Sequence, residues 1–245
     1  MRWIVLISIL VALSGCKKAE NRRCFKSAGA ETTVVRELDA FSGLFVGPNV
    51  NIVLVQDGKN EVHISGGENL VNFISTDIND GVLTVLNENK CNFLRSYKHE
   101  ITVEVHFTGM SYIEFEGTKP LMCQEEITGN NLSLIIRDGA GLVDLDLTYN
   151  NVNVTITNGW GNFDLSGTTG TLIMNIRNNG FGSTYDLNVT NTLDVISNTA
   201  GLLQLNTESA DCKIQLQSTG DIWYVGTPNT LDATELGTGQ LIDKN

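Results

Sequence analysis

The chain has 245 residues, a formal net charge of −12 and a sequence pI of about 4.6. This acidic balance argues against nucleic acid as a partner and against attachment to an anionic membrane by charge alone. Only three prolines occur, which suits strands that use every backbone amide in a sheet.

Residues 1–15 have the features of a signal peptide. After a basic start at Arg2, residues 3–13 form an apolar run that is too short to span a membrane. The run ends in Leu13-Ser14-Gly15-Cys16, which resembles a bacterial lipobox. The resemblance implies cleavage before Cys16 and diacylation of its sulfur, so we expect an exported lipoprotein, at the outer membrane, on a face that the sequence does not indicate. The alternative is an ordinary signal peptide with a chance cysteine.

Residues 16–33 are polar and lack any apolar period, which predicts a flexible tether. Four basic residues close to Cys16 are expected to be solvated near the head groups. Folded structure is expected to begin near Val34 and to form one domain over residues 34–242.

The segment 34–120 is expected to be β-rich but irregular, because short apolar runs alternate with turn residues. The predicted strands are 44–46, 50–56, 62–65, 82–87, 101–106 and 112–116. Asp57-Gly58 and Asp80-Gly81 are typical of tight hairpins. Residues 70–78 fit either a short helix or a strand, and residues 89–99 fit a long surface loop.

Residues 121–242 contain a repeat of about 20 residues. Gly-x-Gly triplets at 139–141, 159–161 and 180–182 each follow an alternating apolar run, and Gly201, Gly220 and Gly239 continue the series. A fixed period with strand alternation is typical of a β-solenoid, in which coils stack about 4.8 Å apart. The sequence therefore predicts an all-β solenoid of regular coils, closed after residue 226 by a last coil that acts as a cap.

The period also predicts columns of equivalent side chains. The inward column is Ile136, Ile156, Ile176, Ile196 and Leu216, and the polar ladder two positions further is Asp138, Asn158, Asn178, Asn198 and Ser218. One coil conflicts, because Leu193 and Val195 alternate out of phase with Ile196. Either that coil slips by one residue, or Ser197 points inward and Asn198 leaves the ladder. The slip is favoured, because the spacing to Gly201 changes as well.

Three segments together resemble a known bacterial family. They are Phe41-x-x-Leu44, Val50-x-Ile52-x-Leu54-x-Gln56-x-Gly58 and Gly81-x-Leu83-x-Val85, followed by the Gly-x-Gly turns. The family is described as putative auto-transporter adhesin, head GIN domain, and the resemblance extends over roughly residues 36–242. It implies a right-handed β-helix in the cell envelope, often of Bacteroidetes-type bacteria, and it brings no catalytic residues. Trp160 and Phe181 depart from the small residue that usually stands between the two glycines, and the Asp that usually follows the second Gly is missing.

Trp160 and Phe181 form the first candidate binding feature. If they occupy equivalent tips of adjacent coils, their rings form an aromatic strip that suits a sugar or a partner's side chains. The alternative is that both rings fold back and pack on the coil.

Asp144, Asp164 and Asp186 are expected to form an outward carboxylate column. Carboxylate oxygens are ligands for Ca²⁺, but no repeat resembles a calcium-binding nonapeptide. A solvated ladder with raised pKa values is therefore favoured.

No metal, cofactor or catalytic constellation is expected from the motifs. His63, His99 and His106 share no ligand spacing, and His106 is expected to face outward from a strand. A polysaccharide lyase needs basic groups, but the repeat offers only Arg137 and Arg177, two coils apart.

Four cysteines remain besides Cys16, and three pairings are open. Cys91 with Cys123 is favoured, Cys212 is expected to be a buried free thiol, and Cys24 lies in the tether. The preferred function is a non-catalytic binding or adhesion module for a glycan or an envelope protein. A structural scaffold of the envelope is the alternative, and a polysaccharide-active enzyme is the third hypothesis.

Overall fold

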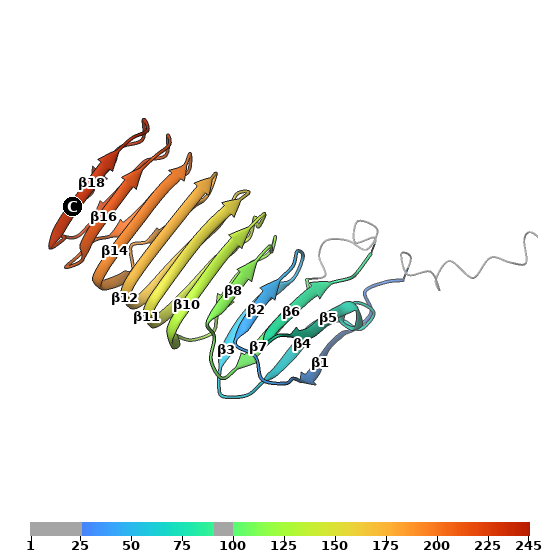
Figure 1. Cartoon of the computed structure of the whole chain (residues 1–245). Coiled ribbons are helices and arrows are strands. Elements are labelled where there is room, and N and C mark those ends of the chain that lie inside the picture. The colour runs from blue at the N-terminus through green and yellow to red at the C-terminus, as the bar shows by residue number, and fades with distance from the viewer. Residues whose placement is uncertain (1–25, 91–99) are drawn as a thin grey trace, which may run out of the picture.

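The computed structural model describes residues 26–90 and 100–245. The expected signal peptide, the lipidation site Cys16, and Cys24, Cys91 and His99 lie outside these residues. The described chain forms an elongated β-solenoid of about seven turns, with its first and last residues at opposite ends (Figure 1). The predicted fold class is therefore confirmed.

The N-terminal strands agree closely with the predicted ones. They are β1 (Glu31–Glu37), β2 (Gly43–Val46), β3 (Asn51–Gln56), β4 (Glu61–Gly67), β5 (Ile74–Asn79), β6 (Val82–Asn87), β7 (Thr102–Phe107), β8 (Tyr112–Phe115) and β9 (Leu121–Cys123). β1 was not predicted, and it starts before the expected boundary at Val34. Residues 70–78 combine both alternatives, because a 3-10 helix at Val71–Phe73 leads directly into β5.

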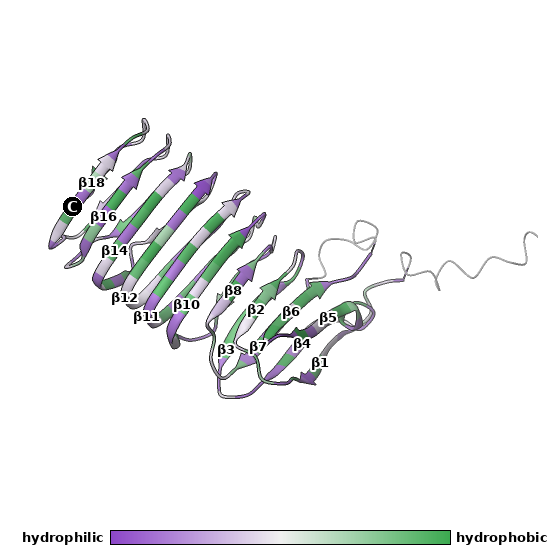
Figure 2. Ribbon diagram, viewed as in Figure 1, coloured by the Kyte–Doolittle hydropathy of each residue, from purple (hydrophilic) through white to green (hydrophobic). Residues whose placement is uncertain are grey.

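The following strands form the regular coils. They are β10 (Ile127–Arg137), β11 (Leu142–Asn158), β12 (Asn162–Asn178), β13 (Phe181–Thr184), β14 (Leu187–Thr199), β15 (Leu203–Asn206), β16 (Asp211–Leu216), β17 (Ile222–Val225), β18 (Thr230–Glu235) and β19 (Leu241–Asp243). Each pairs in parallel with its equivalent in the next coil. Apolar and polar residues alternate along them (Figure 2), and the apolar set fills the interior.

The order of the first coils along the axis differs from their order in the chain. β2 pairs with both β6 and β8, and β3 pairs with both β7 and β9, all in parallel. The coil of β2 and β3 therefore lies between the coil of β6 and β7 and the coil of β8 and β9. This insertion explains why residues 34–120 look irregular in sequence although their strands join the same solenoid.

Antiparallel strands are added at the N-terminal end. β5 pairs with β6 through a turn at Asp80-Gly81, where both residues have positive φ, as the dipeptide predicts. β4 pairs with β7, and β1 pairs with β4. The hairpin expected at Asp57-Gly58 is wrong, because the two strands that it joins, β3 and β4, pair with opposite edges of β7.

The slip by one residue is confirmed. β14 has one extra residue at the bend, since Thr169 lies opposite Val189 but Thr171 lies opposite Thr192. Ser197 thereby takes the place under Ile176 and is buried.

The two alternatives for this coil are one arrangement rather than exclusive ones. The slip that turns Ser197 inward also sets Ile196 on the outer surface and moves Asn198 opposite Arg177, out of the ladder. Within the predicted ladder, a side-chain hydrogen bond links neighbouring coils, from Asn178 Nδ2 to Asn158 Oδ1 at 3.5 Å. Shorter amide rungs form at the bend instead, where Asn150 donates to Asn130 (2.6 Å) and Asn151 to Asn131 (2.9 Å).

One column of glycines shapes the corner between coils. It consists of Gly141, Gly161, Gly180, Gly201, Gly220 and Gly239. A Cβ on Gly220 would lie 2.2 Å from the Gly201 carbonyl oxygen, and one on Gly239 would lie 2.1 Å from that of Gly220. At Gly141, Gly201, Gly220 and Gly239 the stacked backbones therefore approach too closely for any other residue, whereas Gly161 and Gly180 lie against isoleucine side chains.

The last coil is ordered, and no described element covers it. β18 stacks in register on β16, yet all its residues are exposed. Glu235 takes the position of the buried Leu216, so a carboxylate stands where an apolar residue would extend the core. Charge at a free strand edge opposes edge-to-edge association.

Candidate functional site

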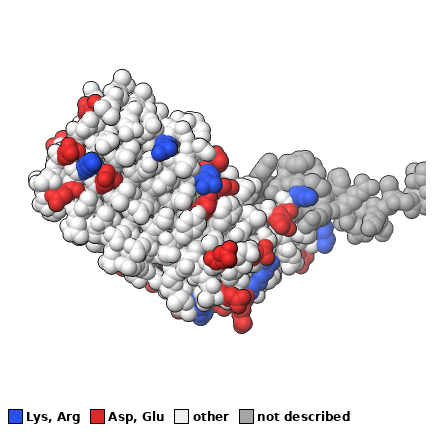
Figure 3. Space-filling model, viewed as in Figure 1, with Lys and Arg blue, Asp and Glu red and all other residues white. Residues whose placement is uncertain are grey.

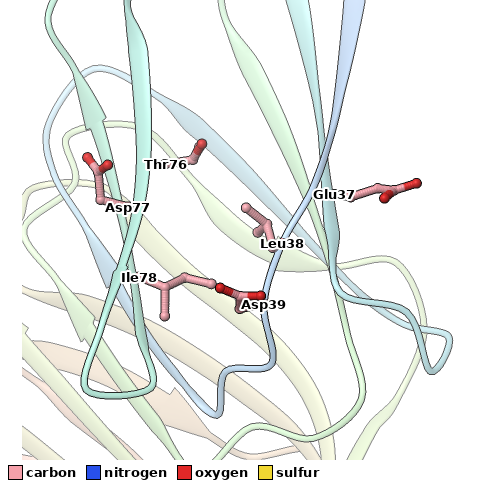
Figure 4. A pocket seen from close by; sticks show the side chains of 6 residues that line it. All are labelled: Glu37, Leu38, Asp39, Thr76, Asp77 and Ile78. Carbon is pink, nitrogen blue, oxygen red and sulfur yellow. The ribbon is translucent and has the colours of Figure 1, made fainter.

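The groove between β1 and β5 contains two carboxylates, Glu37 and Asp77, that point apart. It has a volume of about 470 Å³ and is lined by residues 37–39 and 76–78. The side chains of Glu37 and Asp77 point away from one another across it (Figure 4). A glycosidase needs two carboxyl groups that converge on one bond, and Glu37 and Asp77 do not converge in this way.

Trp160 lies at a corner of the solenoid, between β11 and β12, and is 66% exposed. The preceding Gly159 has φ +82, a conformation that favours glycine and turns the chain tightly. Exposed Asn158, Arg177 and Asn178 lie on the same corner. We call these four residues the Trp160 corner. It combines an apolar ring with amide and guanidinium groups that donate hydrogen bonds.

The expected pairing of Trp160 with Phe181 is wrong. Phe181 lies opposite Asn162, because the glycine shared by the column is the last of the triplet 159–161 but the first of 180–182. The backbone amide of Phe181 accordingly donates to the carbonyl of Gly161 (3.0 Å), and the ring is only partly exposed. Trp160 is therefore the exposed aromatic of this region, without a stacked partner ring at the equivalent position of the next coil.

An uncharged surface adjoins the Trp160 corner on the second halves of β10, β11 and β12. Its outward side chains are Ser133, Ile135, Asn153, Thr155, Ile173 and Asn175. We call this set the uncharged face, and it lies within the broad area without charged side chains in Figure 3. In a chain of net charge −12 this is a notable gap, and Ile173 within it is 46% exposed.

The carboxylate column contains two of the three predicted members. Asp144 lies opposite Asp164, but the next position is Ser183. Asp186 is displaced, and its carbonyl accepts a hydrogen bond from the Gly167 amide (3.0 Å). Burial raises the pKa of Asp164, and the charges of Asp144 and Asp186 raise it further, against a hydrogen bond from Ser183. These outward carboxylates fit the solvated ladder.

A histidine cluster that the motif analysis missed lies on the outer face of β4 and β7. Two identical tripeptides, Glu61-Val62-His63 and Glu104-Val105-His106, run past each other in the antiparallel pair. Glu61 lies opposite His106, and His63 lies opposite Glu104. The histidine ring centroids are 4.2 Å apart. His106 is on the expected outer side but is buried, with 7% exposed.

Asp57 and Lys59 complete the histidine cluster. His106 Nδ1 lies 3.0 Å from Asp57 Oδ2, and Lys59 Nζ lies 3.3 Å from Asp57 and 3.4 Å from Glu61. Burial raises the pKa of Asp57, but hydrogen bonds from His106 and Lys59 outweigh this effect and lower it. The pKa of Glu61 is lowered in the same way. Burial raises it, but hydrogen bonds from His63 and Lys59 outweigh this effect. Both carboxylates are therefore ionised at neutral pH.

The cysteines of the described chain are free. Cys212 is buried, as predicted, and burial raises the pKa of its thiol to about 11. Cys91, the favoured partner of Cys123, lies outside the described residues, and Cys123 is also a free thiol. Its sulfur instead accepts a hydrogen bond from the Asp146 amide (3.1 Å).

The fold defines the class of protein, a β-solenoid. Buried apolar side chains fill its interior, so the groups that can contact another molecule lie on its outer faces. None of the helices in the described ranges has the length and apolarity needed to cross a bilayer.

The model of the putative auto-transporter adhesin, head GIN domain family matches residues 40–228, and the chain belongs to this family. The resemblance expected from sequence is confirmed. Comparison with curated proteins gave no match.

Three solved structures show the same fold. A putative adhesin of Bacteroides fragilis is 24% identical, with a TM-score of 0.75 over 89% of this chain and 99% of the other. A putative adhesin of Parabacteroides distasonis is 17% identical, with a TM-score of 0.61 over 89% and 99%. A protein of the same organism described as a putative lipid binding protein is 16% identical, with a TM-score of 0.58 over 89% and 98%.

Proposed function

We propose that the protein is a non-catalytic binding module of the adhesion type, which recognises a glycan through the Trp160 corner. The family to which the chain belongs is described as a putative adhesin family, which supports an adhesion-type function and an exported or envelope location. Lipid on Cys16 is the proposed anchor, with the outer membrane as the proposed location.

The observation that carries the proposal is the exposure of Trp160. A tryptophan that is 66% exposed gains nothing from core packing, and the tight turn at Gly159 holds it outward. Large exposed aromatic rings are favoured at binding surfaces because they bury much area with few rotatable bonds. The Nδ2 group of Asn158 and the guanidinium of Arg177 supply donors, and Asn178 Oδ1 supplies an acceptor, for the hydrogen bonds that hydroxyl groups of a sugar require.

The uncharged face extends this surface along the coils. Its Ser, Thr and Asn side chains pair with neutral polar groups without the desolvation cost of charges. An extended neutral chain such as a polysaccharide fits a flat face of this composition better than a basic or acidic partner does.

The test is binding of the purified protein to an array of glycans and envelope proteins, with Trp160→Ala beside the wild type. Leu236→Ala is the matched control, because Leu236 is 68% exposed but lies near the far end of the solenoid. Circular dichroism checks that each variant is folded. We expect glycan binding that weakens at least about tenfold in Trp160→Ala, a loss of about 1.4 kcal/mol, and stays unchanged in Leu236→Ala.

Other results change the conclusion in defined ways. Binding to an envelope protein alone, lost in Trp160→Ala, would keep the recognition corner but replace the glycan. Absence of binding, or binding that Trp160→Ala leaves intact, would favour the structural scaffold.

A further inference from the structure

We propose that Glu61, His63 and His106 bind one divalent transition-metal ion, with Zn²⁺ as the best fit. The three residues offer a carboxylate oxygen and two ring nitrogens that lie within 4.8 Å of one another. Two ligands that hold Zn²⁺ tetrahedrally at about 2.0 Å are about 3.3 Å apart. The distance of 3.1 Å from His63 Nε2 to Glu61 Oε1 is already close to this value.

The antiparallel register builds the site from two ordinary strands. Val62 and Val105 are fully buried, so the side chains on either side of each must project from the outer face. Because the two Glu-Val-His tripeptides run in opposite directions, a glutamate lies across from a histidine in two pairs, Glu61 with His106 and Glu104 with His63. The paired backbone of these four residues fixes where their side chains begin. Rotation of the side chains is then enough to bring the ligand atoms around an ion.

His106 provides the observation that points to a ligand. Its Nδ1 lies 3.0 Å from Asp57 Oδ2, and the tautomer that donates to this carboxylate carries the ring proton on Nδ1. In that neutral tautomer Nε2 has a lone pair, and the atom is buried without a hydrogen-bond partner. A buried unpaired acceptor is costly, and a cation would satisfy it. A histidine that binds a metal usually donates its other ring N–H to a carboxylate. This hydrogen bond orients the ring toward the metal.

Neighbouring charges favour a cation at this place. Glu104 Oε2 lies 3.6 Å from His63 Nδ1 and 3.8 Å from His106 Nε2, and Glu37 of β1 lies opposite Glu61. Lys59 is the one cationic side chain that contacts the described cluster, and its side chain is 59% exposed. Two imidazoles select Zn²⁺ and its transition-metal neighbours over Ca²⁺ and Mg²⁺, which prefer oxygen.

The test is titration of the purified protein with Zn²⁺ by calorimetry at pH 7.5, with Co²⁺ absorption as a report on tetrahedral coordination. Because His106 is buried, the main variants are His63→Gln and Glu61→Gln, whose side chains are partly exposed. Asp232→Asn is the control, because Asp232 is an exposed carboxylate on β18, at the other end of the solenoid. Thermal denaturation without metal shows that each variant is folded.

We expect one Zn²⁺ per chain in the wild type and a higher melting temperature with the metal. Affinity should fall at least tenfold in His63→Gln and Glu61→Gln and stay unchanged in Asp232→Asn. Lys59→Gln should bind more tightly than the wild type, because it removes a competing charge from Glu61, whereas a purely structural cluster predicts no gain. The inference is overturned if the wild type binds no Zn²⁺, or if both His63→Gln and Glu61→Gln bind as the wild type does.

Discussion

Asp164 shows how stacking sets the properties of a single side chain. Parallel coils in register place equivalent residues directly opposite one another, so Asp164 lies beside Asp144. Burial and two neighbouring carboxylates raise its pKa, which means that the fold favours its protonated form. Because the folded-state pKa is raised, this group's favourable contribution is complete at low pH and is lost as the pH rises through that pKa.

Asp164→Asn should therefore stabilise the protein at pH 7. Like charges directly opposite on a sheet cost about 0.5 kcal/mol, which corresponds to about 1–2 °C in melting temperature. Differential scanning calorimetry between pH 3 and pH 7.5 would show a gain that shrinks as the pH falls below the raised pKa. Asp194→Asn is the control, because Asp194 lies opposite Lys213 and its loss should lower the melting temperature slightly. A destabilised Asp164→Asn at pH 7 would contradict the argument.

The sequence predicted the positions of some residues well and missed others. Alternation placed Ile136, Ile156 and Ile176 in the core, because it depends only on local pleat and a constant period. The histidine cluster was missed because β4 and β7 are distant in sequence and pair antiparallel. The repeated Glu-Val-His tripeptide was the signal available, and it becomes meaningful only with the register.

At the scale of elements, one inserted residue exchanges the inward and outward side chains along the rest of a strand. The extra residue at the bend within β14 puts Ser197 in the place of the isoleucine column, with its hydroxyl buried and unpaired. Ile196 faces outward opposite Asn175. The same kind of offset separates Phe181 from Trp160. Sequence spacing detected the slip at 193–201 but not its counterpart at 180–182, where the Gly-x-Gly motif itself concealed the change.

The register of β14 predicts unequal effects of the same substitution in two strands. Ile176→Thr places a hydroxyl in the core and removes a methyl group, so we expect a loss of about 3 kcal/mol. Ile196→Thr changes an outer position and should cost less than about 0.5 kcal/mol. Urea denaturation at equal m-values would give both differences. Equal losses would show that Ile196 is inside and that the coil has not slipped.

The order of the first coils lay beyond sequence reasoning. Six of these strands, β2, β3, β4, β6, β7 and β8, were predicted within one or two residues, because turn signals bound them. Their stacking, with β2 and β3 inserted between later strands, has no local signature, since neighbours in the stack are distant in the chain. The Asp57-Gly58 dipeptide misled for the same reason, because a hairpin signal cannot report which edge a strand will join.

At the scale of the whole molecule, the solenoid separates its features along one axis. The described chain starts at the end formed by β1 and β4 to β7 and finishes at the opposite end (Figure 1). The histidine cluster belongs to the first end, the Trp160 corner to the middle coils, and the uncovered last coil to the far end. An anchor that precedes residue 26 would therefore leave the last coil distal and the Trp160 corner on the flank, where a partner that lies along the coils can reach it.

Cys16→Ser should release the protein from the membrane fraction. The argument is that an acidic chain, with no membrane-crossing helix in its described parts, gains little from a membrane surface by charge. Stable attachment then depends on acyl chains, each buried CH₂ of which contributes about 0.8 kcal/mol. Radiolabelled palmitate incorporation and membrane fractionation in the native host would measure both steps.

Cys24→Ser is the matched control for this experiment, because it removes a nearby cysteine outside the lipobox. It should keep both the label and the membrane location. If Cys16→Ser remains labelled and membrane-bound, the lipobox assignment is wrong and attachment has another source. If Cys16→Ser loses the label but stays on the membrane, the solenoid itself binds the envelope. Repeating that fractionation with Trp160→Ala added would then decide whether the Trp160 corner provides the contact.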